Sequence, residues 1–247
     1  HQEARRQRQM CIRDSISSET INCKCCQDSY TLVPELKYPI CNRRIGIVPQ
    51  SLKLLLNKRH QYSKLLKTTT NKSKLEIYKQ RKAALKWILV TSFGYLGFNN
   101  AKFGRIDAHM SVCAFARKLL LDAIHIAEKE GFTVLHGIVD SIWVQKKGAT
   151  KKDYTSLGIK IAEKIDFDLS LDIYNWIVFL PSKENKVVHV ANRYFGAKND
   201  GEIKIRGIET RRRDTPKFFK KCQLEILDIF SSCKTIADVK ASITEAK

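Results

Sequence analysis

The sequence predicts an α+β fold in which helices cover one face of an antiparallel sheet. Two basic helical segments come first, a long amphipathic helix follows, and several β-rich runs separated by short turns come after it. Strands joined by short turns pair antiparallel, whereas parallel strands need a long crossover between them. A chain of 247 residues can bury one large core or two modest ones.

The first 15 residues carry Arg and Gln without hydrophobic periodicity. Their string RQRQMCIRDS is similar to translated adapter sequence found at the ends of fragmentary reading frames, and it lacks the apolar run of a signal peptide. We therefore expect residues 1–15 to be a non-native leader. Residues 16–47 are irregular and hold Pro34, Pro39 and a group of cysteines.

Four of the eight cysteines fall close together, at Cys23, Cys25, Cys26 and Cys41. Their spacing is irregular for a zinc knuckle, which uses C-x-x-C pairs. Two interpretations stay open: a structural zinc ion held by these thiolates, or ordinary small buried residues. The spread of the other cysteines does not indicate a disulfide scaffold and favours a reducing intracellular setting.

Two basic helices are predicted over residues 49–67 and 75–90, each with apolar residues at helical spacing. Residues 68–73 form a short polar linker, so the helices are expected to pair as an antiparallel hairpin. The run TSFGYLGF at residues 91–98 alternates small and aromatic residues. It indicates either a helix end stopped by glycine or a turn whose backbone a planar ligand can approach.

A third helix is predicted over residues 106–130, where we interpret His109 and His125 as core or rim histidines. Residues 132–144 predict a tight β-hairpin with Asp140 at its turn. A carboxylate there is either a turn residue bonded to its own backbone or a metal ligand. A helix over residues 153–164, strands over 169–180, 187–195 and 203–208, and a helix that begins at Thr215-Pro216 complete the chain.

Lys and Arg number 45 against 25 Asp and Glu, which gives a net charge of +20 and a pI near 9.7. Such an excess favours a polyanionic partner, because each neutralised phosphate releases condensed counterions. Nucleic acid is the partner indicated, although anionic membrane surfaces would produce the same excess. No run of eighteen apolar residues is present, so no membrane span is predicted.

The order of these motifs resembles the polymerase region of B-family DNA polymerases, over roughly residues 16–247. The resemblance implies a palm, which is an antiparallel sheet with helices on one face, a two-helix fingers hairpin, and the start of a helical thumb. Residues 16–47, with the cysteines, and residues 99–214 would be palm, residues 48–98 fingers, and residues 215–247 thumb. The match is expected to begin just after the first catalytic aspartate motif of the family, since Ser18-Glu19-Thr20 resembles the Pro-Glu-Thr that follows it.

The fingers motif of the family, Lys-x-x-x-Asn-Ser-x-Tyr-Gly, matches KWILVTSFG at residues 86–94. Its lysine and glycine are kept, and Val90 stands in place of the asparagine. In the preceding helix Arg59 matches the triphosphate-binding arginine, whereas Ser63 replaces a lysine of the family. The resemblance implies a catalytic role for Lys86 and nucleotide binding by Arg59, Lys86, Thr91, Phe93 and Gly94.

The palm motif of the family, Tyr-Gly-Asp-Thr-Asp-Ser, matches HGIVDS at residues 136–141. Ile138 replaces the first acid, and Asp140 keeps the second. Nucleotidyl transfer uses two metal ions, which bridge the primer 3′-oxygen and the α-phosphate and are held by carboxylates. The resemblance implies that Asp140 is a catalytic ligand for Mg²⁺, partnered in the family by an upstream aspartate. Ile138 is expected to weaken metal binding.

Two further motifs match groups that hold duplex backbone in the family. NRY at residues 192–194 stands in place of Lys-Lys-Tyr, and RGIETRRRD at residues 206–214 matches Arg-Gly-x-Glu-x-x-Arg-Arg-Asp. Taken alone, the three consecutive arginines would be a solvated basic run. The resemblance implies contacts that position DNA without reading its sequence, made by Asn192, Arg193, Tyr194, Arg206, Gly207, Glu209, Arg212, Arg213 and Asp214.

The resemblance therefore implies a DNA-templated DNA polymerase that extends a primer 3′-hydroxyl by a two-metal mechanism. Its expected partners are primer–template DNA, deoxynucleoside triphosphates and a sliding clamp or other replication and repair proteins, in the cytoplasm and associated with the nucleoid. The altered motifs are similar to those of an archaeal paralogue group of the family. They leave a second hypothesis open: a polymerase-derived structural subunit that binds primer–template DNA without catalysis.

Overall fold

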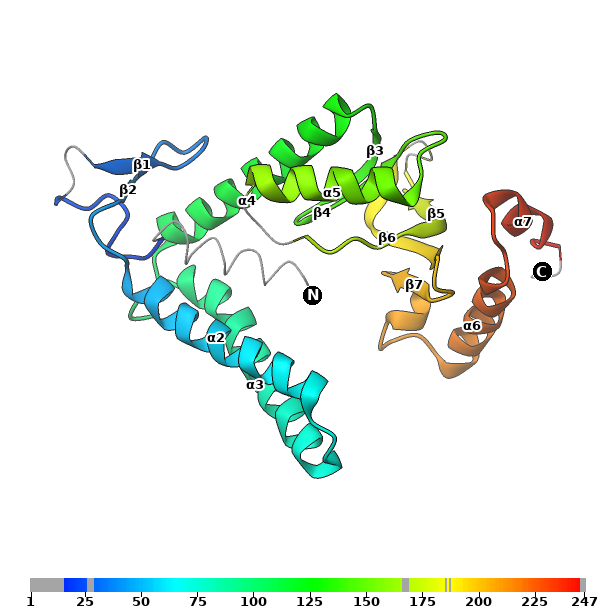
Figure 1. The fold of residues 1–247 in the computed structure, drawn as a ribbon, viewed down its shortest axis with the longest axis horizontal. Helices are drawn as coiled ribbons and strands as arrows, with labels where there is room; N and C mark the ends of the chain where they lie inside the picture. Colours follow the sequence, from blue (N-terminus) through cyan, green and yellow to red (C-terminus); the bar gives the residue numbers. More distant parts are fainter. Residues whose placement is uncertain (1–15, 26–28, 166–168, 185, 187, 245–247) are drawn as a thin grey trace. The chain divides into compact units, whose positions relative to one another are not determined.

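The computed structural model describes residues 16–25, 29–165, 169–184, 186 and 188–244. The chain divides into unit 1, His1–Ile126 with Gly137–Trp143, and unit 2, Ala127–His136 with Val144–Lys247. Helices alternate with small antiparallel sheets (Figure 1), which confirms the predicted α+β class. The described strands form three small sheets, of two, two and three strands, and not the single sheet predicted.

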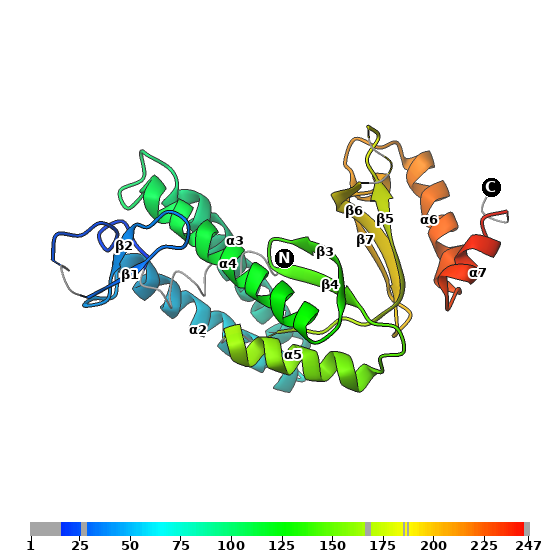
Figure 2. The ribbon, with the colours of Figure 1, turned by 90° about the horizontal axis from the view of Figure 1, so that it is seen from above.

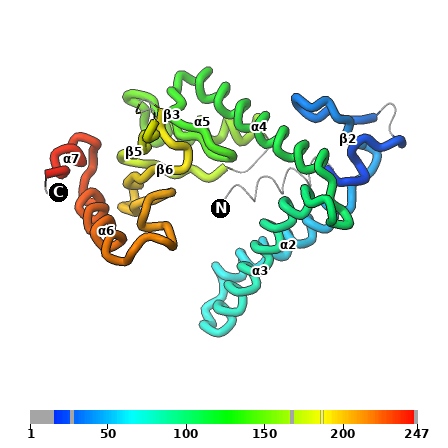
Figure 3. The backbone as a smooth tube through the Cα atoms, turned by 180° about the vertical axis from the view of Figure 1, so that it is seen from behind, coloured from blue at the N-terminus to red at the C-terminus, as the bar shows by residue number. Residues whose placement is uncertain are grey.

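Unit 1 begins with a small lobe and continues into two paired helices. In the lobe, β1 (Tyr30–Leu32) pairs antiparallel with β2 (Pro39–Cys41). Helices α2 (Ile47–Thr68) and α3 (Lys72–Leu96) then run side by side in opposite directions (Figure 3), as the polar linker predicted. The Asn71 side chain in this linker caps α3 by accepting a hydrogen bond of 3.1 Å from the Lys74 N–H.

Helix α3 continues to Leu96, so the helix predicted over residues 75–90 was too short, and of the two interpretations of residues 91–98 the helix end stopped by glycine is confirmed. Its last residue is Leu96, which is 3% exposed, and Gly97 follows as the C-cap. The Phe93 ring stacks on His109 of α4 (Ile106–Lys129), with a centroid distance of 4.1 Å. Gly94 lies inside α3 and costs about 1 kcal/mol of helix stability relative to alanine. The packing contacts outweigh this cost.

The core of unit 1 joins the lobe to all three helices. Helix α4 contributes small residues, which allow close packing of neighbouring elements, and α2 and α3 contribute leucines. The buried members of this core are Ile16, Ile21, Val33, Ile40, Leu52, Leu56, Leu89, Leu96, Ala108, Val112 and Ala114.

Strands β3 (Thr133–Ile138) and β4 (Ser141–Gln145) form the predicted hairpin. Its tip belongs to unit 1, and its base belongs to unit 2. Helix α5 (Lys151–Ile165) follows and is amphipathic, because its buried residues Leu157, Ile161 and Ile165 recur at helical spacing.

Unit 2 is built on the antiparallel sheet of β5 (Tyr174–Pro181), β6 (His189–Lys198) and β7 (Ile203–Arg206). Helix α6 (Lys217–Ser231) lies beside this sheet (Figure 2), and Phe230 packs with Trp176 in a shared core. The Trp176 indole N–H donates a hydrogen bond of 2.9 Å to the Cys233 carbonyl. A short helix, α7 (Ile236–Ala241), begins with a capping box that the sequence analysis did not predict.

In the part of the chain that the structure describes, no helix is long and apolar enough to cross a membrane.

Candidate functional site

Asp140 lies at the tip of the β3–β4 hairpin, in a two-residue turn with Val139. Val139 has a φ of +50°, in the left-handed region that costs an L-residue roughly 1–2 kcal/mol and suits a β-branched side chain poorly. The Ser141 hydroxyl donates a hydrogen bond of 3.2 Å to Asp140 Oδ1. Strained backbone conformations gather at functional sites, so this half-buried carboxylate is the first candidate for chemistry.

The side chain of Asp140 fits part of a magnesium site. Carboxylate oxygens are the hard ligands that Mg²⁺ prefers. Among the described residues, no group of three or more metal-ligating side chains gathers around Asp140. Ile138, at the position where the family pattern has an acid, offers the ion only an apolar side chain. Asp140 therefore fits as one ligand, and the described residues around it do not complete the site.

The residues predicted to bind the nucleotide lie on α2 and α3. The side chains of Arg59 and Lys86 are half-buried, one on each helix. Gly94 is exposed, and no heavy atom lies within 4 Å of the place where a Cβ would be. The surface beside Gly94 is therefore accessible to a planar ligand that approaches the backbone.

Two hydroxyl side chains of these helices bond to their own helix backbone: Thr91, which was predicted to bind nucleotide, and Ser63, which replaces a lysine of the family. The Thr91 hydroxyl donates to the carbonyls of Trp87 and Ile88 at 3.1 and 3.0 Å, and the Ser63 hydroxyl donates to the Arg59 carbonyl at 3.0 Å. Serine and threonine commonly satisfy themselves in this way inside helices. Nucleotide binding by Thr91 stays a prediction.

The Phe93 ring is held from one side by His109. Besides the stacking contact, His109 Nδ1 lies 3.1 Å from the Phe93 carbonyl oxygen. A Cβ at Gly97 would approach His109 Nδ1 to 2.8 Å, so glycine at this position allows the close contact. His109 is thus a half-buried packing residue that orients Phe93, whereas His125 is exposed.

In unit 2, Glu209 binds protein groups. Its Oε1 pairs with Arg193 Nη2 at 2.5 Å, and its Oε2 accepts a hydrogen bond of 3.0 Å from the Gln223 amide. The hydrogen bond from Gln223, then a backbone hydrogen bond at Glu209 and the charges of Arg193 and Arg212, hold the pKa of Glu209 below its usual range despite its burial. These bonds tie Glu209, in the 3₁₀ turn Glu209–Arg211, to Arg193 of β6 and Gln223 of α6. Its contact with DNA stays a prediction.

The arginine cluster of unit 2 contains both paired and exposed cations. Arg212 forms a two-point pair with Asp214, at 3.0 Å from Nε to Oδ1 and 2.5 Å from Nη2 to Oδ2. Arg206, Arg211 and Arg213 are exposed and make no ion pair with any described residue. Arg211 was absent from the predicted set, although the run of three arginines that contains it was the available signal.

Gly207 and its neighbours form a tight junction between β6 and β7. Gly207 has a φ of +63°, and a Cβ there would overlap the carbonyl oxygen of Asn192. Arg193 Nε also donates to the Gly207 carbonyl at 3.2 Å. Tyr194, paired across the strands with Arg206, is only 6% exposed, and burial raises the pKa of its phenol. Gly207 therefore allows the end of β7 to approach β6 closely, and the buried Tyr194 side chain packs within the same pair of strands.

Two histidines of unit 2 form a pair that the sequence analysis did not find. His136 is 7% exposed, its Nε2 lies 2.9 Å from the Ala191 carbonyl, and its Nδ1 lies 2.8 Å from Nε2 of His189. The carbonyl can only accept, so His136 Nε2 carries the proton and His136 Nδ1 accepts from His189. The two residues are 53 positions apart, so no local pattern could have indicated the pair.

Three of the four predicted zinc ligands come together in unit 1. The Sγ atoms of Cys23, Cys25 and Cys41 all lie within 4.8 Å of one another, a group that could hold a metal ion. Cys26 lies outside the described residues.

Comparisons with known proteins agree on one family. A family model described as DNA polymerase family B matches residues 5–246. DNA polymerase 2 of Saccharolobus solfataricus is 35% identical over 229 residues, which cover 93% of this chain and 32% of that protein. A DNA polymerase of Archaeoglobus fulgidus is 29% identical over 244 residues, which cover 96% of this chain and 30% of that protein. The chain thus spans about a third of the length of these relatives.

The fold is also found in a solved structure. The family B DNA polymerase from the hyperthermophilic archaeon Pyrobaculum calidifontis matches with a TM-score of 0.68 and 24% sequence identity. The match covers 98% of this chain and 30% of that one.

We predict that Gly207→Ala destabilises unit 2 more than Gly201→Ala. Gly201 has a φ of +85° with open space around its Cβ position, so alanine there costs only the left-handed strain, about 1–2 kcal/mol. Alanine at Gly207 adds the overlap with the Asn192 carbonyl, about 1–3 kcal/mol more. Urea unfolding of both variants measures the difference, and equal losses would contradict the assigned packing.

We predict that His136 makes the stability of the chain depend on pH. Burial, with the neighbouring His189 adding to it, lowers the pKa of His136 despite the bond to Ala191. At pH values between this lowered pKa and the unfolded value of about 6.5, the unfolded chain binds more protons. Stability is therefore fully present above about pH 6.5 and is lost as the pH falls toward the folded pKa.

The measurement is urea unfolding at pH 7.5 and pH 5.5. His136→Phe should be less stable than the wild type at the higher pH, because it loses the bond to Ala191, and should lose less stability on acidification. His125→Gln, at an exposed histidine, should keep the pH dependence of the wild type. An unchanged pH dependence in His136→Phe would refute the assignment.

Proposed function

The chain belongs to DNA polymerase family B, and from that premise we propose that it carries the nucleotide-binding and primer–template-binding parts of a DNA-templated DNA polymerase. The observation that carries this proposal is Asp140, a single half-buried carboxylate at a strained hairpin tip. It stands in a chain that also keeps the fingers lysine and the arginine cluster of the family. A carboxylate so presented suits the metal-assisted transfer of a nucleotide.

We assign Asp140 the role of a magnesium ligand. Bound Mg²⁺ would supply Lewis-acid stabilisation of the charge that develops on the phosphate oxygens. Asp140 would contribute an oxygen to the ion, and the Ser141 hydroxyl would hold that carboxylate in orientation through its 3.2 Å bond. The hairpin backbone fixes where the carboxylate is presented.

We assign Arg59 and Lys86 the binding of the incoming triphosphate. Each is half-buried, so a phosphate contact there is less screened by water than on an open surface. Lys86 would neutralise charge on the phosphates, and Arg59 would bind phosphate oxygens through its planar fork. Phe93, oriented by His109, and the exposed backbone at Gly94 would present a flat surface to the nascent base pair.

We propose that the exposed arginines of unit 2 bind the phosphate backbone of primer–template DNA; they are Arg206, Arg211 and Arg213. Phosphate contacts of this kind position a duplex without reading its sequence. Glu209 contributes by holding Arg193, and Gly207 by allowing the junction of β6 and β7 to close. Binding of DNA in this way implies association with the nucleoid.

A second candidate function is a polymerase-derived subunit that binds primer–template DNA without catalysis. Ile138 in place of an acid is the observation that favours it, since it removes one metal ligand of the family pattern. The two functions differ in whether Asp140 matters to chemistry.

We predict that Asp140→Asn lowers primer extension by at least about 100-fold, because it removes charge from a metal ligand that supplies several kcal/mol. The assay uses the longest natural protein that carries this chain, with Mg²⁺ or Mn²⁺. Ile138→Asp should raise activity, because it restores an acid beside the ion. Asp200→Asn, at the turn between β6 and β7, is the matched control and should change nothing. Extension in the wild type that is unaffected by Asp140→Asn would remove the assigned role, and no extension in either metal would favour the second function.

We predict that the chain binds duplex DNA with a strong dependence on salt. Replacing Arg206, Arg211 or Arg213 with Gln should each make the negative slope of log K against log salt shallower by about 0.9, for one lost phosphate contact. Arg212→Gln should have a smaller effect, because Arg212 is already paired with Asp214. Fluorescence anisotropy over a salt series measures these slopes. Identical slopes in all four variants and the wild type would contradict the proposed surface.

A further inference from the structure

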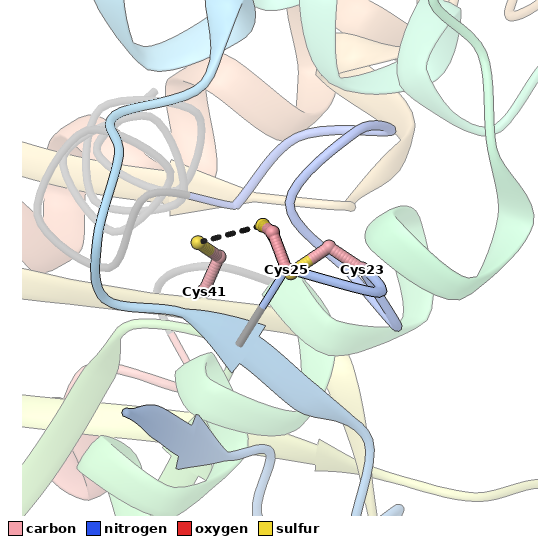
Figure 4. A group of neighbouring side chains, drawn as sticks. All are labelled: Cys23, Cys25 and Cys41. Carbon is pink, nitrogen blue, oxygen red and sulfur yellow. Dashed lines mark hydrogen bonds between the residues drawn. The ribbon is translucent and has the colours of Figure 1, made fainter. Parts of the chain in front are cut away.

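Three thiols of unit 1 converge in the small lobe that precedes helix α2 (Figure 4). Cys25 Sγ lies 3.2 Å from Cys23 Sγ and 3.9 Å from Cys41 Sγ. A disulfide requires about 2.05 Å between sulfurs, so no disulfide joins any two of these three residues. The cluster belongs neither to the hairpin tip nor to the nucleotide-binding helices.

The sulfur separations suit a single tetrahedral metal ion. Zinc binds thiolates at about 2.3 Å, which places the sulfurs of a tetrahedral site about 3.8 Å apart. The distances from Cys25 Sγ to the other two sulfurs lie on either side of this value, and the third pair lies within 4.8 Å. Shifts of less than 1 Å would bring all three sulfurs to one ion. Thiolates select a thiophilic ion such as Zn²⁺ over the hard ions that prefer oxygen.

The ligands are anchored to backbone that is already paired. Cys41 ends β2, is 1% exposed, and donates its N–H to the Thr20 carbonyl at 2.9 Å. Cys23 and Cys25 lie in a turn just after Ile21, which forms a bridge to Ile40. The site thus combines a buried ligand on a strand with two ligands on a turn, and the exposed Cys25 gives an ion a path of entry.

The lobe is of a kind that gains from such an ion. Its two strands have three residues each, and a two-stranded sheet of that size is marginal by itself in water. We propose that Cys23, Cys25 and Cys41 bind one zinc ion, with the fourth position left to a ligand outside these three. The ion would fasten the turn to β2 and so stabilise the lobe from which α2 begins.

The test is a metal titration of the 247-residue chain, without an affinity tag, after chelation under reducing conditions. Co²⁺ is the probe, because thiolate coordination gives it a sulfur-to-metal charge-transfer band and intense visible bands, which Zn²⁺ then removes. We expect one equivalent to bind. Cys25→Ser and Cys23→Ser should each weaken binding by more than about 100-fold, since even residues that only support metal ligands cost 10–100-fold when replaced. Cys222→Ser, at a half-buried thiol of α6, should leave affinity unchanged.

Circular dichroism on each variant keeps the result interpretable. Cys25 is exposed, so Cys25→Ser is expected to fold whether or not metal binds. Cys41→Ala, the variant of the third ligand, removes a buried side chain. Loss of the charge-transfer band in folded Cys25→Ser supports the proposal. Absence of the band in the reduced wild type overturns it, and so does an unchanged affinity in Cys25→Ser and Cys23→Ser. Because the readout is metal binding, the result is independent of any polymerase activity.

Discussion

Unit 1 depends on a short segment, residues 17–21, that ties three distant parts of the chain together. Arg105, at the start of α4, donates from Nη1 to two carbonyls of this segment, at 2.9 and 3.0 Å. Glu19 accepts from the Ile47 N–H at 2.5 Å and so caps α2, which has no cap from its own N-cap side chain. Burial raises the pKa of Glu19, but hydrogen bonds from Ser17 and Ile47 outweigh it and leave the pKa lowered. Helix α2, the lobe and the start of α4 therefore share one hydrogen-bonded junction.

Features that follow from hydrophobic periodicity and turn residues could be predicted from the sequence, whereas features that depend on tertiary contacts could not. The class, the paired basic helices and the acidic hairpin follow from local patterns. The last turn of α3 was missed because Leu96 and His109 stabilise it through packing that propensity does not contain. The ion pair of Glu209 with Arg193 could not be predicted either, because a motif names residue types and cannot say which carboxylate has a protein partner. The pair of His136 and His189 depends on strands that meet only in the fold.

The arginines of unit 2 are of two kinds: some are paired with a carboxylate, and others have no such partner among the described residues. Arg193 and Arg212 each have a carboxylate partner within unit 2, and these pairs lie in and beside the loop that follows β7. Exposed pairs of this sort contribute little stability, because water screens the two charges and the side chains lose conformational entropy. Neighbouring arginines without such partners stay available to a polyanion. Net charge favours a polyanionic partner, and the structure adds which of these arginines are paired with a carboxylate and which are exposed without one among the described residues.

The hairpin that carries Asp140 has a consequence for how its sequence can vary. Side chains along a strand alternate between faces, so a slip of one residue in the pairing would turn Asp140 to the opposite side. The two-residue turn, with Val139 held in the left-handed region, fixes this register through the backbone. Exchange of an acid for isoleucine at position 138 therefore removes a negative charge without re-aiming the one that is kept. The charge at this tip depends on the side chains of residues 138 and 140, whereas the direction in which Asp140 points depends on the backbone of the turn.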